Sequence, residues 1–184
     1  ADACDRDGLA LPELSGQTVE ALQPFMPHTG TLGNPIDLTF SKSPMDYFAG
    51  IPAVLLAEDN IDNLLAYFLA PSAFIERALK QMGLTPDKVV EESRKLAKDA
   101  AEKFTRKVKA QNKPVVGFTY RSLNEAFARH LINSGIPIFP DPTRASRALR
   151  ALLDYKAIKA RAPEDGAAED GGQNHREQQV GSRA

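Results

Sequence analysis

The residues best suited to chemistry in this sequence form the segment Asn34-Pro35-Ile36-Asp37. A carboxamide and a carboxylate flank a backbone that Pro35 restrains, and such a loop can orient a phosphate-bearing loop or a catalytic partner. The same residues also suit an Asx-type turn at the end of a strand, with no part in chemistry. Asn34 and Asp37 are therefore candidate site residues, and a plain turn is the alternative.

Histidines supply a second type of candidate. His28 lies in Pro27-His28-Thr29-Gly30, and a neutral imidazole beside a glycine can accept a phosphoryl group. We interpret it by default as a loop histidine. His130 lies on an expected helix and is expected to be partly exposed or hydrogen-bonded, and His175 lies close to the C-terminus.

The sequence lacks the motifs that several kinds of binding site and enzyme need. One cysteine and three scattered histidines provide no metal-ligand spacing, so no metal site is expected. Neither a Gly-x-Ser-x-Gly motif nor a glycine-rich loop ending in Lys-Ser/Thr occurs, which disfavours a freestanding hydrolase or NTPase. Cys4 lies among Asp2, Asp5 and Asp7, which raise a thiol pKa, so we expect a small core residue instead of a nucleophile.

The composition is that of one globular core. The chain has 184 residues, 42% hydrophobic and 26% charged, and its 23 basic and 24 acidic residues give a formal charge of −1. So weak a net charge favours neither nucleic acid nor an anionic membrane as a partner. The absence of a signal-peptide pattern or a long apolar run, together with the single cysteine, indicates the cytoplasm.

Apolar runs of strand length alternate with segments of helical period. Strands are expected at Asn63 to Ala70, Pro114 to Tyr120 and Ile136 to Phe139, each apolar enough to be covered on both faces. This alternation predicts a three-layer α/β domain with a mostly parallel sheet.

Helices are expected around these strands, over residues 15–25, 44–57, 87–111, 123–134 and from Asp141 onward. Ser15 should cap the first, and Pro52 should break or bend the second. The spacing in the helix over 87–111 and in the helix from Asp141 onward predicts buried positions at Val89, Val90, Leu96, Ala97, Ala100, Phe104, Val108, Ala145, Ala148, Leu149, Leu152 and Leu153.

The two ends of the chain differ from this core. Residues 159–184 hold almost nothing that could join a core, so they predict a disordered tail after a domain that spans residues 1–158. Residues 1–7 predict a helix of at most two turns that stops at Gly8. A doubly wound sheet should place a strand and a turn before such a helix, so the domain is expected to be truncated at its N-terminus.

Four segments match one known family in the right order. They are Ala1–Ser15 (ADACDxxGLxLxxLS), Asn34–Leu38 (NPIDL), Lys113–Val115 (KPV) and Gly135–Tyr155 (GIPIFxxPxRAxRALxALxxY). Together they resemble the ligase-CoA domain of NDP-forming acyl-CoA synthetases, the ADP-forming acetate-CoA ligase relatives of succinyl-CoA synthetase. The resemblance extends over roughly residues 1–158.

The resemblance implies a flavodoxin-like domain in a larger enzyme that converts acyl-CoA, NDP and phosphate into free acid, CoA and NTP. A histidine of another domain carries the phosphoryl group in that family, so His28, although its surroundings are similar, lies in the wrong domain. Family members have a glycine-rich turn just before the helix that holds Cys4, and this sequence lacks that turn.

Partners and cofactors follow from the same resemblance. CoA-binding and ATP-grasp domains or subunits are the implied partners; CoA and ADP or ATP with Mg are implied for the complete enzyme, and none of them for this chain alone. The lysine-rich helix of residues 84–112 could contact the anionic part of CoA or a subunit, but alternating charges favour a solvated face. The alternative to a ligase domain is a non-catalytic remnant or interaction module with the same fold.

Overall fold

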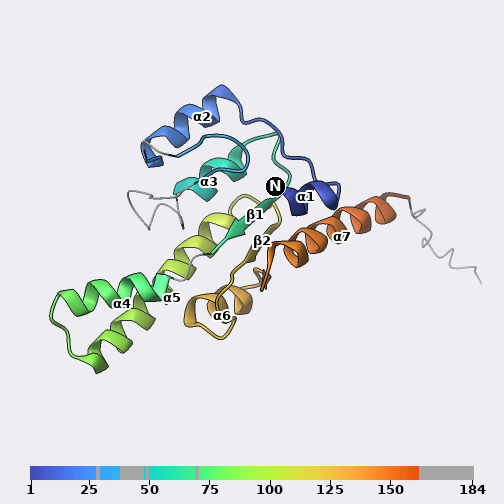
Figure 1. Cartoon of the computed structure of the whole chain (residues 1–184). Helices are drawn as coiled ribbons and strands as arrows, with labels where there is room; N and C mark the ends of the chain where they lie inside the picture. The colour runs from blue at the N-terminus through green and yellow to red at the C-terminus, as the bar shows by residue number, and fades with distance from the viewer. Residues whose placement is uncertain (28–29, 38–47, 49, 69–70, 162–184) are drawn as a thin grey trace, which may run out of the picture.

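The computed structural model describes residues 1–27, 30–37, 48, 50–68 and 71–161 (Figure 1). Three strands form one sheet: β1 (Leu64–Tyr67), β2 (Val115–Phe118) and β3 (Ile138–Phe139). The helices are α1 (Asp2–Arg6), α2 (Gly16–Leu22) with the 3₁₀ turn η1 (Gln23–Phe25), α3 (Gly50–Ala57), α4 (Pro71–Gln81), α5 (Pro86–Lys109), α6 (Ala126–Asn133) and α7 (Pro142–Arg161).

The sheet is parallel throughout, in the order β1-β2-β3. Leu64 pairs with Val115 and Gly117 with Ile138. All three strands lie within the apolar runs that predicted them, so the expected α/β class and parallel sheet are confirmed. The arrangement is consistent with a flavodoxin-like fold.

Successive residues of the strands point to opposite faces and supply two separate cores. On one face, Phe104, Leu131 and Val115 belong to a cluster that α3, α5 and α6 cover. On the other, Cys4 and Leu9 pack with Val116, Ala145 and Leu149 beneath α1 and α7. The helices therefore form two layers around the sheet, as Figure 1 shows.

Gly117 allows the first of these cores to pack closely on β2. A Cβ atom at this position would lie 2.3 Å from Cε2 of Phe68 and 2.6 Å from Cδ1 of Ile138, which is too close for any side chain. The Phe68 ring instead lies against the backbone and makes an edge contact with Phe104, with ring centroids 5.1 Å apart.

Helix α1 runs in the same direction as α7. The hydroxyl of Ser146, which is fully buried, donates a hydrogen bond to Asp7, and Gly8 faces the guanidinium of Arg150 one turn further along α7. Gly8 has a φ of +66°, which ends α1 as the sequence predicted. Since α7 begins where β3 ends, α1 also begins at the carboxyl edge of the sheet.

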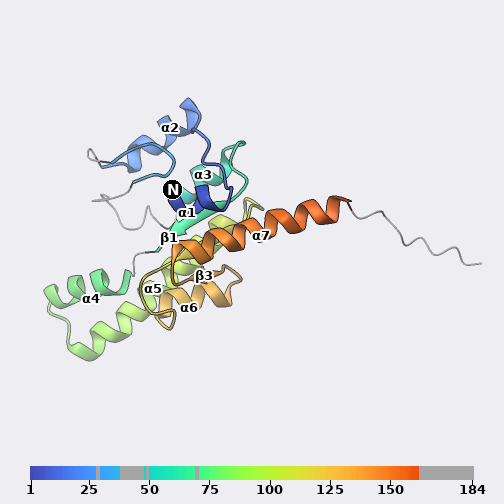
Figure 2. The same cartoon turned by 45° about the vertical axis from the view of Figure 1, so that its right-hand side comes forward.

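Three of the positions that the helical spacing assigned to the core were predicted wrongly. Val90 and Leu96 of α5 are 47% and 43% exposed, and Leu152 of α7 is 48% exposed. The start of α5 projects past the sheet beside α4, and the end of α7 projects in another direction (Figure 2). Periodicity gives the apolar face of a helix, but it does not show how far the neighbouring layer extends.

Two expectations concern the ends of helices. Of the expected helix over residues 44–57, α3 covers Gly50–Ala57, while residues 44–47 and 49 lie outside the described residues. Pro52 lies in the first turn of α3, where the missing N–H breaks no helical hydrogen bond, so α3 continues without the expected break. α7 continues to Arg161, past residue 158, where the domain was expected to end, while residues 162–184 lie outside the described part. None of the described helices is both long and apolar enough to cross a bilayer.

Candidate functional site

The carboxyl ends of β1, β2 and β3 meet at one edge of the sheet, together with the first residues of α1 and α7. In open parallel sheets, ligands bind outside this edge because several loops converge there. The loop from Thr119 to Glu125 follows β2, and Asp141 follows β3. This edge is the candidate site.

Internal hydrogen bonds shape the loop after β2. The backbone N–H of Arg121 donates to Thr119 Oγ1 at 3.2 Å, and the N–H of Asn124 donates to Ser122 Oγ at 3.2 Å. Arg121 Nε lies 2.9 Å from Glu125 Oε1, although the Arg121 side chain is still 57% exposed. The loop thus holds a guanidinium at the surface in a defined position.

A small crevice opens beside this loop. Its rim carries Thr119, Arg121, Ser122 and Glu125, and apolar side chains line the rest, among them Phe68, Phe127, Leu131 and Ile138. The space that it encloses is about 10 Å³, roughly what one water molecule needs and far below the roughly 300 to 1,000 Å³ that is typical of small-molecule sites. The crevice therefore holds no complete coenzyme.

Asp141 connects the end of β3 to the start of α7. Its Oδ1 accepts a hydrogen bond of 2.8 Å from the backbone N–H of Arg144, and its Oδ2 lies 2.9 Å from Arg144 Nη1. The carboxylate therefore already satisfies the first turn of α7, where an unpaired helix terminus would attract an anion.

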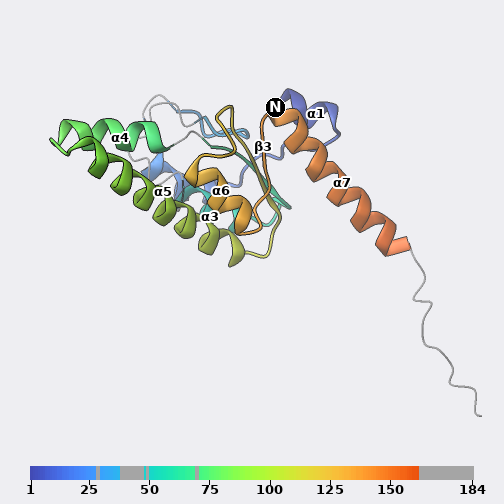
Figure 3. The ribbon, with the colours of Figure 1, turned by 90° about the horizontal axis from the view of Figure 1, so that it is seen from below.

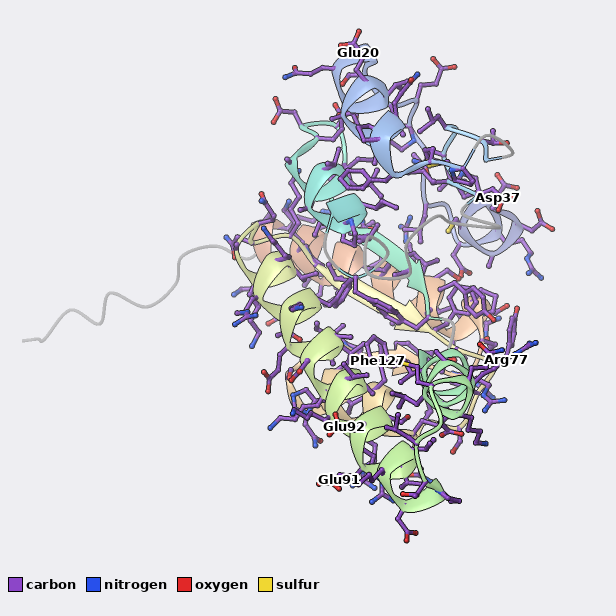
Figure 4. The ribbon with its side chains drawn as sticks, turned by 90° about the vertical axis from the view of Figure 1, so that its left-hand side faces the viewer. Glu20, Asp37, Arg77, Glu91, Glu92 and Phe127 are labelled. Carbon is purple, nitrogen blue, oxygen red and sulfur yellow. The ribbon has the colours of Figure 1, made fainter. Side chains whose placement is uncertain are left out.

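The structure describes both residues of the loop candidate. Asn34 donates from Nδ2 to the backbone carbonyl of Pro12 at 3.0 Å, which ties the loop to the segment that follows α1. The backbone N–H of Asp37 donates to the carbonyl of Thr31 at 3.3 Å in an isolated antiparallel bridge. The Asp37 side chain is exposed, and Figure 4 shows it on the same side of the molecule as Arg77 of α4, the side toward which β1 runs.

The other candidates lie elsewhere. His28 and His175 fall outside the described residues. His130 is partly buried on α6, with Nε2 3.6 Å from Glu102 Oε1 of α5. Burial raises the pKa of the Cys4 thiol, and Asp7 adds a smaller increase, so this group is not a reactive thiolate at neutral pH. Within the described ranges, no three His, Cys, Asp or Glu side chains gather as a metal site would need.

The lysine-rich helix has the surface that alternating charges predict. Every lysine and arginine of α5 is exposed, and Lys98 Nζ lies 3.7 Å from Glu102 Oε1 one turn away. Ion pairs of this kind add little stability, so these side chains form a solvated face in this structure.

Two groups of polar residues were missed in the sequence. Arg121, Ser122 and Asp141 directly follow predicted strands, and the rule that ligands bind at carboxyl strand ends could have selected them. Glu58 had no such signal. Its Oε2 accepts hydrogen bonds from the Ser15 hydroxyl at 2.7 Å and from the Ser15 N–H at 3.3 Å, across 43 positions of sequence.

Glu58 should make the stability of the domain depend on pH. Hydrogen bonds from the side chains of Thr18 and Ser15 lower the pKa of Glu58 below its ordinary value of 4.5, although burial opposes them. A carboxyl with a lowered folded-state pKa contributes its full stabilisation above the unfolded value, and loses it as the pH falls through the folded value. Urea unfolding between about pH 6 and about pH 3 should therefore show a steeper acid loss in the wild type than in Glu58→Gln. Equal slopes would contradict this role.

One comparison with known proteins found relatives that align with most of this chain, and two comparisons found none. No family model matches the chain, and no solved structure matches it. The chain is 30% identical over 156 residues to the acetate-CoA ligase (ADP-forming) II subunit alpha of Pyrococcus furiosus, with 83% of the chain and 30% of that protein aligned. It is 29% identical over 161 residues to acetate-CoA ligase (ADP-forming) I of Archaeoglobus fulgidus, with 88% of the chain and 20% of that protein aligned. The chain thus spans less than a third of the length of either relative.

Proposed function

Because the chain belongs to the family of NDP-forming acyl-CoA synthetases, we propose that it serves as the ligase-CoA domain of such an enzyme. The complete enzyme would convert acyl-CoA, NDP and phosphate into the free acid, CoA and NTP through a phosphohistidine of another domain. The observation that carries the proposal is the alignment of more than four fifths of this chain with two ADP-forming acetate-CoA ligases.

The proposal assigns the phosphoryl-transfer site to the carboxyl edge of the sheet. The Asn34 to Asp37 loop, the Arg121 loop and the start of α7 would face the phosphoryl-transfer site, and Asp37 would position a polar partner there. The crevice is too small for CoA, so CoA and ADP or ATP with Mg would be bound by the CoA-binding and ATP-grasp parts. We propose the cytoplasm as the location of the enzyme, because a single cysteine suits a reducing compartment.

Reconstitution tests the proposal. The chain alone should show no activity, since it contains neither a phosphate-binding glycine-rich motif nor the expected phosphohistidine segment. Mixed with the separately produced CoA-binding and ATP-grasp parts from the same organism, it should restore ADP- and phosphate-dependent release of CoA from acetyl-CoA. The free thiol and the ATP formed are both measurable.

The control is the same mixture without this chain, which should be inactive. A gene for these parts beside the coding region would identify the polypeptides to mix. If every such mixture is inactive, the chain is instead an interaction module or a remnant with the same fold, and the proposal fails.

A further inference from the structure

The outer half of α7 carries large apolar side chains that the described part of the chain leaves uncovered. Leu152, Tyr155 and Ile158 are 48%, 59% and 62% exposed. They recur every three residues and lie on one flank of the helix, which we call the α7 flank. Figure 3 shows this half of α7 extending beyond the sheet and beyond α1.

The α7 flank begins at the edge of the buried stripe of the same helix and turns away from it. At 100° per residue, Leu152 lies within about 20° of Ala145, which is fully buried against the sheet, whereas Tyr155 and Ile158 lie about 80° and about 140° from it. The flank is therefore a band of exposed apolar surface that leaves the core and runs round to the opposite side of α7. Exposed apolar surface with charged side chains beside it is typical of a surface that a partner covers.

The charges beside the α7 flank indicate the nature of that partner. α7 carries six exposed basic residues, Arg144, Arg147, Arg150, Lys156, Lys159 and Arg161, but a single acidic one, Asp154. Asp154 is already paired with Arg150 at 2.7 Å, and the Lys159 ammonium lies 5.8 Å from the centre of the Tyr155 ring. A second copy of α7 on this flank would bring like charges together, whereas an acidic surface would complement them.

We propose that the α7 flank binds an acidic protein surface with an apolar centre, located on the part of the acyl-CoA synthetase that this chain lacks. This inference rests on the proposed function, because it takes the partner from the same enzyme. Leu152, Tyr155 and Ile158 supply the apolar centre of the interface, and the lysines and arginines of α7 form its charged rim.

Two double variants test the interface through the binding affinity instead of the enzyme activity. The full chain is titrated with the polypeptide that holds the CoA-binding and ATP-grasp parts, and the dissociation constant is measured by calorimetry. Leu152→Asp with Ile158→Asp should weaken binding at least about tenfold, because charges replace the apolar centre. Lys156→Glu with Lys159→Glu should also weaken it, and added salt should reduce wild-type affinity.

Matched controls lie on α5, on the other face of the sheet. Leu96→Asp changes an equally exposed leucine and Lys107→Glu an exposed lysine, and neither should alter the affinity. All six substituted positions are exposed, so each variant should keep the wild-type melting temperature within a few degrees. That measurement separates loss of binding from loss of folding.

Each other outcome overturns the inference in a distinguishable way. Unchanged affinity in the aspartate variant, with restored activity, removes the α7 flank but leaves the proposed function standing. Self-association of the chain that the same variant abolishes assigns the flank to a second copy. Binding of the chain alone to phosphatidylserine vesicles, lost in the variant, assigns it to a membrane surface. Absence of both binding and activity rejects the interface and the proposed function together.

Discussion

Replacing Phe104 with alanine should lower the free energy of unfolding by about 3 to 5 kcal/mol. Phe104 has no exposed surface and lies in the middle of the core that α5 and α6 form on the sheet. Its ring meets the edge of Phe68, whose position in turn depends on the missing side chain of Gly117. The rigid sheet cannot collapse into the space that the ring leaves, so a cavity adds to the lost burial.

Leu96→Ala is the matched control for Phe104→Ala. Leu96 lies on the same helix at a position that helical spacing also assigns to the core, but it is 43% exposed. Its replacement should change the unfolding free energy by no more than about 0.5 kcal/mol. Urea unfolding with unchanged denaturant dependence measures both values. Equal losses for the two variants would mean that α5 packs differently from the structure described here.

Asp37→Asn should slow turnover of the reconstituted enzyme by more than about tenfold, with little change in melting temperature. Asn34 and Asp37 hold a loop on the carboxyl side of the sheet, and Asp37 is exposed there. A carboxylate that positions a partner in phosphoryl transfer acts through its charge, which asparagine removes. Asparagine retains the shape of the side chain and can still form the Asx turn, so a residue that only shapes the turn should tolerate the change.

Asp59→Asn provides the control for Asp37→Asn, because Asp59 is another exposed carboxylate, in the turn after α3. It should leave both turnover and melting temperature unchanged. Turnover and melting temperature should be measured on the same preparations, so that a loss of folded protein is recognised. Full activity of Asp37→Asn at unchanged stability would remove Asp37 from the site.

Local physical chemistry explains which parts of the fold could be predicted. Three continuous apolar runs predicted β1, β2 and β3, because a parallel strand covered on both faces needs apolar side chains on both. Ser15 was predicted as a cap, and its hydroxyl does accept a hydrogen bond from the N–H of Thr18 at 3.2 Å. Gly8 was predicted to end a helix, and it has a positive φ angle.

The sequence by itself thus determined the class of fold and the direction of the strands, because apolar strands and amphipathic helices alternate along the chain. It also determined the residues that begin or end several helices, because these depend on neighbours within a few positions. Only the tertiary structure decided that Glu58 holds Ser15 and that Asp7 meets Ser146, because such pairs are far apart along the chain. It also decided that Leu96 and Leu152 stay exposed while Phe104 and Leu149 are buried. Helical spacing places all four on apolar faces, but burial requires another layer opposite them. The end of α7 extends past the sheet that would cover Leu152, and Leu96 lies just outside the covered side of α5, which holds Ser93 and Ala97.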